Sequence, residues 1–465
     1  MKAIFSLRSL LAVVFTAVSL CQTSHANISL STKEHQRGYY LDLRAFHNQG
    51  MQASGQQQLN RSALQTKLGV KAKYLLGENW LLDSDVRLAG ILQHINTSTD
   101  SRSANDIYLE AKQLYLKSGT VFGRQSSLSL SIGRQTFRDL HSWNYDVELD
   151  AIRLKFSRTL LQWELAYGGR LFDYRMGDDE YRPSIESSRF LLGTLQHQWH
   201  YKHYVGAYSL TEQNSVSEDQ TSVVFRADEL IEPRTNLTWY GIKSHGEYST
   251  TRGAFKYSGT LATLYGDTQA LSTTTLGNGD RQVTAFTNQT IKGGMAIDLR
   301  LAWQPAEKKY AIALNYATAS GDNTVGSGNQ KRYVQPNIAT NKSRVLGDSR
   351  YRYYGEALNP DLSNLHIATI TAGRPMNDNI WIEAAYHLYR QDKASPYLEA
   401  SSPKLSPNGN SRDIGQGLDL VLGGTLKNGS KLQVILSGFW GGNAFGNTAQ
   451  VKNIYRALVN YRVLF

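Results

Sequence analysis

The chain ends in Tyr455-Arg-Ala-Leu-Val-Asn-Tyr-Arg-Val-Leu-Phe465, eleven residues that predict the fold. Counting back from Phe465, every second residue is apolar or aromatic, and Arg456, Asn460 and Arg462 lie between them. Because the side chains of a strand alternate between its two faces, this segment has an apolar face and a charged face. A terminal aromatic residue closing such a strand is typical of outer-membrane barrels, in which the apolar face contacts lipid and the arginines point into the lumen.

The first residues predict export from the cytoplasm. Lys2 and Arg8 flank the start of an apolar run at 10–20, and Ser24-His-Ala26 follows it. This is the pattern of a secretory signal with a small-x-small cleavage site, and the run is too short for a membrane-spanning helix. We expect residues 1–26 to be a cleaved signal peptide.

The remaining 27–465 is then predicted to form a single transmembrane barrel domain without linkers. Cys21 suggests a lipoprotein, but the Leu20 before it does not fit lipoprotein cleavage. Removal of the signal takes away the single cysteine of the chain, so we expect no disulfide in the mature protein.

The composition fits many strands with aromatic girdles, since the chain has 27 Tyr, 8 Trp and 39 Gly but only 9 Pro. A mean hydropathy of −0.41 suits a soluble protein, and it equally suits a barrel whose strands are half polar. The formal net charge is +11, or +9 once Lys2 and Arg8 are removed. For an exported chain without a nucleic-acid motif, this charge predicts contact with a polyanion outside the cytoplasm and no nucleic-acid partner.

The turns between the alternating segments are of two kinds. Short polar turns occur at 77–79, 305–308, 376–378 and 427–430. Long connections fall near 48–60, 95–105, 138–148, 173–186, 214–233, 269–282, 319–362, 392–413 and 441–448. A strand on each side of nine long connections gives 18, an even number as bacterial barrels require.

The predicted fold class is therefore all-β: a transmembrane antiparallel β-barrel of about 18 strands, of the outer-membrane type. Clean two-residue alternation occurs at 82–88, 310–316 and 380–388, whereas 214–300 is the least regular stretch. A barrel of this size is wide enough for an aqueous channel. Its inward polar rows would line the pore and set the selectivity.

Several segments, in order along the chain, resemble the alginate export porin family. They are Gly133-Arg-Gln135, Trp239-Tyr-Gly-Ile242, Gly355-Glu-Ala357 with Leu362-Ser-Asn-Leu365, and Asp413-Ile-Gly-Gln416 with Leu418-Asp-Leu420. The resemblance implies an 18-stranded outer-membrane barrel with an electropositive constriction, through which an anionic exopolysaccharide leaves the cell.

The same resemblance implies pore residues in this chain. Arg44, Lys112 and Arg350 stand at positions that are basic in the family pore. Asp146 matches an acidic pore residue, and Asp178 lies near the position of another.

The chain also departs from the family pattern. Thr136, Gln433 and Ile435 stand about where arginines are expected. The connection at 95–105 and the turn at 427–430 are both short, where the resemblance implies longer gating segments. The barrel and the export class do not depend on these positions, whereas the identity of the polymer does.

Strand alternation adds further lumen candidates. Arg456 and Arg462 should face inward, either toward substrate or paired with a carboxylate of a neighbouring strand. Arg153 alternates with apolar neighbours and should also face inward, with Asp83 or Asp85 as the expected partner if it does not contact substrate.

Arg134 has the parity of the apolar Leu130 and Ile132, which would place it on the lipid side. A bulge at Gly133 would turn it toward the lumen, and the family motif favours that orientation. We therefore predict that Arg134 lines the pore.

The long connection at 319–362 carries Arg350 and Arg352 among Gly, Ser and Asn, together with Lys331, Arg332, Lys342 and Arg344. It is long enough to fold into the lumen and narrow the channel. The alternative is a surface loop whose cations bind anionic lipopolysaccharide.

Nothing in the sequence predicts an enzyme or a cofactor. The histidines are scattered and Gly-x-Ser-x-Gly is absent. Metal-ligand spacing is missing, and the aromatic neighbours of His197, His200 and His203 favour a membrane-interface belt. The sequence leaves open whether the acidic segment 177–180 binds a structural calcium ion.

The sequence thus predicts a monomeric outer-membrane channel that exports an anionic exopolysaccharide, with an alginate-like polyuronate as the expected polymer. Expected partners are that polymer, outer-membrane lipid and lipopolysaccharide, and periplasmic polysaccharide-synthesis or export proteins. A diffusion porin for small anionic or sugar solutes is the alternative, and a non-transporting structural barrel or adhesin is a third class.

Overall fold

The computed structural model describes residues 31–32, 35–52, 58–97, 101–119, 127–171, 187–214, 216, 219, 221–225, 233–276, 281–322, 328–396, 398, 405–446 and 453–465. The predicted signal peptide, Asp178 and the acidic segment 177–180 lie outside these residues. In this described part of the chain, no helix is long and apolar enough to cross a membrane.

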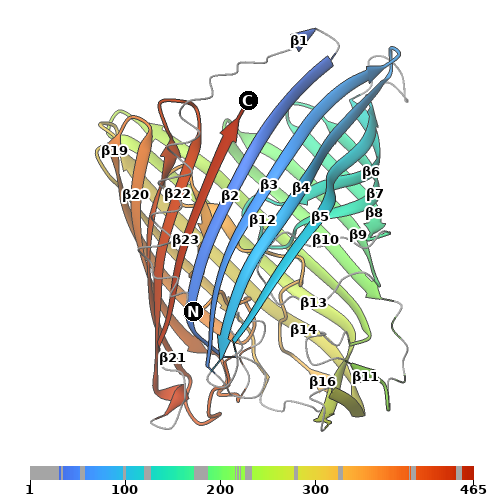
Figure 1. Ribbon diagram of the computed structural model, residues 1–465, viewed down its shortest axis with the longest axis vertical. Helices are drawn as coiled ribbons and strands as arrows, with labels where there is room; N and C mark the ends of the chain where they lie inside the picture. Colours follow the sequence, from blue (N-terminus) through green and yellow to red (C-terminus); the bar gives the residue numbers. More distant parts are fainter. Residues whose placement is uncertain are drawn as a thin grey trace.

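Eighteen long antiparallel strands of the described chain close into a barrel (Figure 1). They are β2 (His35–Gln52), β3 (Gln58–Leu76), β4 (Trp80–Thr97), β5 (Ser101–Ser118), β6 (Leu128–Arg138), β7 (Asp146–Ser157), β8 (Leu161–Gly169), β9 (Ser188–His200), β10 (His203–Asn214), β12 (Thr235–Thr250), β13 (Gly253–Thr275), β14 (Arg281–Pro305), β15 (Ala311–Ala319), β19 (Leu365–Asn377), β20 (Ile380–Gln391), β21 (Asp413–Thr425), β22 (Lys431–Gly441) and β23 (Asn453–Leu464).

Six short elements complete the described structure. They are β1 (Ser31–Thr32), β11 (Val224–Phe225), β16 (Asn329–Gln330), the hairpin of β17 (Lys342–Arg344) with β18 (Arg350–Arg352), and the 3-10 helix η1 (Asn443–Phe445).

The terminal strand closes the barrel, as its alternation predicts. β23 pairs with β22 on one side and with β2 on the other, and the Phe465 amide donates to the Tyr39 carbonyl at 2.9 Å. Each strand pairs with its neighbour in the chain, so the connections alternate between the two ends of the barrel. The four predicted short turns share one end, and the nine connections predicted to be long share the other, although the one between β4 and β5 spans only 98–100. The predicted fold class is confirmed.

The stretch with the least regular alternation forms the longest strands of the described barrel. β13 and β14 have 23 and 25 residues, and the register between them shifts between Leu264 and Tyr265 and again between Ser272 and Thr273. Each shift reverses the parity of the following side chains, which is why alternation is blurred there.

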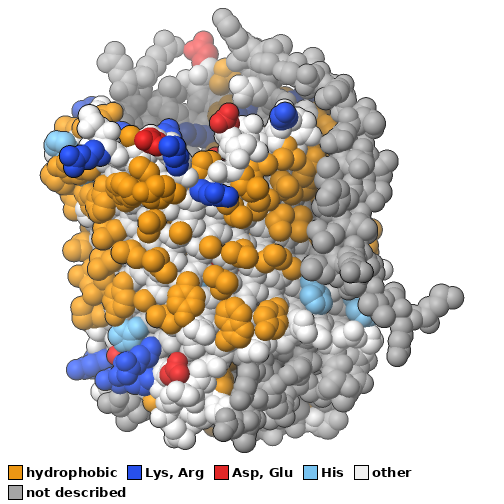
Figure 2. All heavy atoms as spheres, turned by 90° about the vertical axis from the view of Figure 1, so that its left-hand side faces the viewer, with side chains coloured by type: hydrophobic (Ala, Val, Ile, Leu, Met, Phe, Trp, Pro, Cys, Tyr) orange, Lys and Arg blue, Asp and Glu red, His pale blue; other side chains and the backbone are white. Residues whose placement is uncertain are grey.

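The outer surface carries the side chains that membrane lipid requires. Leu109, Ile242 and Leu314, like most large exposed hydrophobic residues, lie on the outward parity of their strands. Figure 2 shows hydrophobic side chains gathered in a belt across the face of the barrel in view, with charged side chains above and below it. The belt is the expected lipid-facing surface of a transmembrane barrel.

The end of the β6–β7 hairpin leaves the barrel wall. Pairing of β6 with β5 stops at Leu114 opposite Arg134, and pairing of β7 with β8 stops at Asp150 opposite Gly169. β6 and β7 nevertheless pair with each other as far as Arg138 opposite Asp146. We call residues 135–149 the inner hairpin.

Both faces of the inner hairpin are covered by other parts of the lumen. Phe137 and Leu149 are buried in a cluster with Tyr208 and Trp239 from β10 and β12. On the other face, the amide of Gln113 from β5 donates to the Thr136 hydroxyl at 2.8 Å. The hairpin therefore lies inside the barrel.

The connection between β15 and β19 also folds inward, as its length predicts. We call residues 328–364 the inner loop. All residues from 350 to 363 are buried or half-buried, and Trp239 of the wall donates from Nε1 to the Val334 carbonyl at 2.7 Å. The inner loop fills much of the lumen, so the alternative of a surface loop is wrong.

Candidate functional site

A buried cluster of charges attaches the inner loop to the wall. Glu356 accepts from Arg352 at 3.1 Å and lies 3.8 Å from Arg456 of β23, and all three side chains are buried. The Glu356 amide donates to Asp419 of β21 at 3.0 Å. Burial raises the pKa of Glu356, but the charges of Arg352 and Arg456 outweigh it and hold the pKa below 4.5.

Aromatic side chains hold the same loop on the opposite side. Trp143 of the inner hairpin donates from Nε1 to the Tyr354 hydroxyl at 2.8 Å, and that hydroxyl donates to Asp298 of β14. Tyr389 donates to the Tyr354 carbonyl at 2.8 Å. A Cβ at Gly355, which has φ +106°, would lie 2.1 Å from the Tyr389 hydroxyl oxygen. The residue at 355 therefore has to be glycine for this contact.

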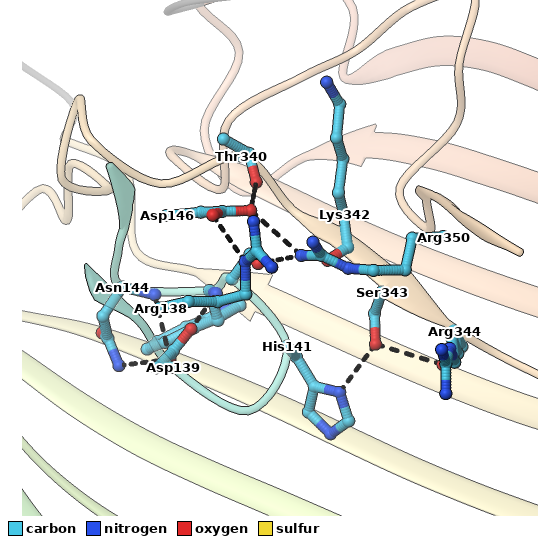
Figure 3. A network of polar contacts seen from close by, with 12 residues as sticks. Arg138, Asp139, His141, Asn144, Asp146, Thr340, Lys342, Ser343, Arg344 and Arg350 are labelled. Atoms are coloured by element: carbon cyan, nitrogen blue, oxygen red, sulfur yellow. Dashed lines mark hydrogen bonds and ion pairs between the residues drawn. The ribbon is translucent and has the colours of Figure 1, made fainter. Parts of the chain in front are cut away.

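A second group of polar contacts joins the inner hairpin to the inner loop (Figure 3). Asp146 accepts from Arg138 at 2.6 Å, from Arg350 at 3.0 Å and from the Thr340 hydroxyl at 3.1 Å. Arg350 also donates to the Ser142 hydroxyl and to the Lys342 carbonyl. Both arginines point at Asp146, Arg138 from the inner hairpin and Arg350 from the inner loop, whereas the side chain of Lys342 extends away from the group.

His141 extends this connection to the wall. Its two ring nitrogens lie 2.9 Å from the Ser343 hydroxyl of the loop and 3.1 Å from the Ser258 hydroxyl of β13. Burial lowers the pKa of His141 well below 6.5, and the nearby charges of Arg300 and Lys243 lower it further. A neutral imidazole therefore links hairpin, loop and wall.

A basic cavity lies between the inner loop and the wall formed by β21–β23 and β2–β4. Its volume is about 480 Å³, and seven lysines and arginines line it against two aspartates. The basic residues are Arg44, Lys67, Arg87, Arg344, Arg350, Lys431 and Arg462, and the acidic ones are Asp42 and Asp348. We call this the first cavity.

The strand register concentrates these cations at one level. Lys431 lies opposite Arg462, Arg462 opposite Asp42, and Asp42 opposite Lys67 across β22, β23, β2 and β3. Lys431 directly follows the turn at 426–430, so this row lies near the short-turn end of the lumen. Short turns mark the periplasmic side of outer-membrane barrels.

The cations of the first cavity differ in how they are paired. Arg462 is bound by Asp42, and Arg87 by Glu110 at 2.6 Å. Arg344 and Lys431 are exposed and form no ion pair with any described residue. These two side chains are therefore available to an anion in the cavity.

The structure separates the predicted pore residues into two groups. Arg44, Arg350 and Arg462 line the first cavity. Six others within the described residues do not line it: Lys112, Arg134, Asp146, Arg153, Arg352 and Arg456. Arg352 and Arg456 belong to the buried attachment of the inner loop, Asp146 binds Arg350, and Lys112 lies near Glu148 of the inner hairpin.

The bulge predicted at Gly133 is absent, and the carboxylate partner predicted for Arg153 is wrong. The register between β6 and β7 passes through Gly133 without a shift. Arg134 is nevertheless buried, unlike the lipid-facing Ile132, and it lies opposite Asp150 and binds it at 2.8 Å. Arg153 pairs with Glu164 of the adjacent β8 at 2.5 Å, and not with Asp83 or Asp85. In each case the partner is the carboxylate directly across or beside the arginine on the neighbouring strand.

Sequence reasoning missed Arg87 and Lys431 as lining residues. Lys431 carried a usable signal, because the first residue after a short turn, on the inward parity, must lie near the mouth of the lumen. Gln433, where the family pattern predicts an arginine, also lines the cavity and donates to the Arg350 carbonyl at 2.9 Å.

The described residues contain no group of three or more His, Cys, Asp or Glu that could hold a metal ion. His203 is buried and makes ring contacts with Trp199, Tyr248 and Tyr257.

Comparison with solved structures agrees with the fold. The Pseudomonas aeruginosa porin OccK7 (OpdD) covers 92% of this chain and 99% of its own, with a TM-score of 0.57 and 10% identity. OccAB4 of Acinetobacter baumannii has a TM-score of 0.56 and 12% identity, and the match covers 94% of this chain and 100% of OccAB4. P. aeruginosa OccK2 (OpdF), solved in complex with glucuronate, has a TM-score of 0.52 and 11% identity, and the match covers 92% of this chain and 98% of OccK2.

Sequence comparison identifies the relatives. The alginate production protein AlgE of P. aeruginosa is 25% identical over 340 residues, which is 72% of this chain and 67% of the relative. AlgE of Pseudomonas syringae is 26% identical over 320 residues, 64% and 62% of the two chains, so the matched region spans under two thirds of that relative. The alginate export family matches residues 29–459. This chain is therefore an outer-membrane β-barrel of the alginate export family.

Proposed function

We propose that the barrel is the outer-membrane exit channel for an alginate-like polyuronate, which enters from the periplasm through the first cavity. The observation that carries this proposal is the lining of that cavity, with seven cations against two aspartates. Membership of the alginate export family supports it.

The chemistry of the polymer explains the arrangement of the cations. A polyuronate carries one carboxylate per sugar, and each loses hydration on entering a narrow lumen. Guanidinium and ammonium groups offset that loss through charge-assisted hydrogen bonds. Cations already bound to wall carboxylates, such as Arg462 with Asp42, hold a passing anion less tightly than free ones. A mixture of paired and unpaired cations therefore attracts the polymer without trapping it.

We further infer that the protein acts as a monomer and receives the polymer from periplasmic synthesis or export proteins. The closed hydrogen-bonded barrel supports the first point, since every wall strand finds its partners within one chain. The position of the basic row near the short-turn end supports the second.

A second candidate is a diffusion porin for small anionic sugars, favoured by the likeness to the Occ porins. The two functions differ in the length of the solute that crosses. A porin passes a free uronate but excludes a long polymer, whereas an exit channel must pass both.

A liposome efflux experiment decides between them. Vesicles that contain the purified protein are loaded with fluorescent polyuronate of narrow length distribution, or with neutral dextran of equal length. The proposal predicts efflux of the polyuronate and retention of the dextran. Retention of the polyuronate together with efflux of free glucuronate would contradict it and favour the porin.

A further inference from the structure

A second cavity lies on the other side of the inner loop, against β12–β15 and β19. Its volume is about 610 Å³, which falls in the range of roughly 300–1,000 Å³ usual for ligand sites. Arg344 and Asp348 of the inner loop line both cavities, so this part of the loop separates the two.

Small side chains on neighbouring strands create the space. Lys256 lies opposite Ala302, Ala302 opposite Ala313, and Ala313 opposite Thr371, which forms one row across β13, β14, β15 and β19. All four line the second cavity. The two consecutive alanines leave the room that larger inward side chains would fill.

The rest of the lining includes aromatic and charged side chains. Tyr204 stacks on His245 with ring centroids 4.9 Å apart, and the Arg300 guanidinium lies 3.4 Å from the centre of the Tyr353 ring. Arg300 Nη2 makes no hydrogen bond within the described residues.

Four cations, Lys202, Lys256, Arg300 and Arg344, line the second cavity against two carboxylates, Glu247 and Asp348. Lys202 and Lys256 share Glu247, at 2.9 and 3.8 Å. Arg344 adds an exposed guanidinium that has no ion pair among the described residues. Aromatic rings beside donors and a cation suit a ligand with an apolar ring face, hydroxyl groups and a carboxylate.

We propose that the second cavity is a binding subsite for one uronate residue of the polymer, with its carboxylate at Arg344. This inference rests on the proposed function. Arg344 faces both cavities, so a chain in the first cavity can place an adjoining sugar in the second. An oligouronate would then bind at two linked subsites, and binding at the second becomes intramolecular.

The test measures binding of glucuronate and of a uronate hexamer to the purified protein by calorimetry. The wild type should bind the hexamer at least about tenfold more tightly than the monomer, because both subsites are engaged. Ala313→Trp fills the second cavity and should remove that advantage. Thr425→Trp, in the first cavity, is the matched bulky control and should weaken both ligands.

A second variant avoids any change of packing. Arg344→Gln alters an exposed side chain and should lower hexamer affinity about tenfold, the effect expected for one charge-assisted contact. Electrophoresis without heating, in which folded barrels migrate faster, checks that each variant is folded. Unchanged hexamer binding in both Ala313→Trp and Arg344→Gln, in protein that still releases polyuronate from liposomes, would overturn the second subsite and leave the proposed function standing.

Discussion

At the scale of single residues, the basic side chains of the lumen have two different roles. Arg352 and Arg456 are buried around Glu356, where they attach the inner loop. Arg344 and Lys431 are exposed on the cavity without ion pairs to described residues. An arginine in the lumen therefore does not by itself indicate a substrate contact. Its burial and its ion-pair partner decide whether it binds substrate or attaches the inner loop.

Replacement of Glu356 by glutamine should destabilise the barrel by about 3–5 kcal/mol, because the buried guanidinium groups of Arg352 and Arg456 each lose a counter-charge. The midpoint of urea unfolding in detergent measures the change. Glu307→Gln is the control, since Glu307 pairs with Lys309 on an exposed turn and its loss should have no measurable effect. Equal midpoints for Glu356→Gln and the wild type would refute the attachment role of this cluster.

Acidification should weaken the link between hairpin, loop and wall at His141. The folded protein holds the pKa of His141 well below 6.5, so the unfolded chain binds the proton more readily. The contribution of His141 to stability is complete above pH 6.5 and falls as the pH decreases below it. The thermal midpoint of the wild type should therefore drop between pH 7.5 and 5.5 more than that of His141→Gln. Parallel pH profiles for the two proteins would show that His141 is not held neutral.

The partners of the arginines could not be predicted from the sequence. Two-residue alternation assigns a side chain to a face, but the register with the next strand decides which carboxylate lies beside it. Arg153 illustrates this: its inward face was predictable, whereas its pairing with Glu164 depends on the β7–β8 register. The partner of Arg462 was easier to predict, because the closure of the barrel places β23 against β2, which carries Asp42.

At the scale of elements, the inner hairpin and the inner loop together narrow the channel. Three motifs that carry the family resemblance lie at their contacts: Gly133-Arg-Gln135 where the hairpin leaves the wall, Trp239 under Val334, and Gly355-Glu-Ala357 at the buried attachment. The motifs therefore specify how the lumen is filled. The cations that face the cavity come mostly from other positions.

The strands and connections were largely predictable, because alternation and turn chemistry are local properties of the chain. The inward departure of the inner hairpin was not. It follows from β5 and β8 ending their pairing with β6 and β7 early, which is a property of neighbouring strands. Thr136 and Glu148 consequently lie in the lumen although they have the parity of the lipid-facing Ile132 and Ile152.

Replacement of Trp143 by alanine should loosen the inner loop. Trp143 is buried, binds Tyr354 and stacks on Tyr333 with centroids 6.1 Å apart, so its loss should cost about 3–5 kcal/mol of stability. We expect a larger and noisier single-channel conductance in planar bilayers. Trp199→Ala, at an exposed ring of the outer belt, serves as the control and should leave conductance unchanged. A Trp143→Ala channel indistinguishable from the wild type would refute the role of this contact.

At the scale of the whole molecule, three surfaces divide the tasks. The apolar belt faces lipid, and the inner loop and inner hairpin narrow the lumen (Figures 1 and 2). The cations near the short-turn end make the first cavity positively charged. Fold and location followed from the period-two pattern and the family resemblance. The residues that line the first cavity could not be predicted without the register of β22, β23, β2 and β3, which brings Lys431, Arg462 and Lys67 to one level.

The reversal potential of single channels in a potassium chloride gradient tests the central claim most directly, because it reports the sign of the charge that ions meet in the lumen. We predict anion selectivity for the wild type. The double variant Lys431→Gln with Arg344→Gln should shift the potential toward zero, and Lys427→Gln, on the turn outside the cavity, should not. A cation-selective wild type, or a double variant with the wild-type potential, would contradict the account.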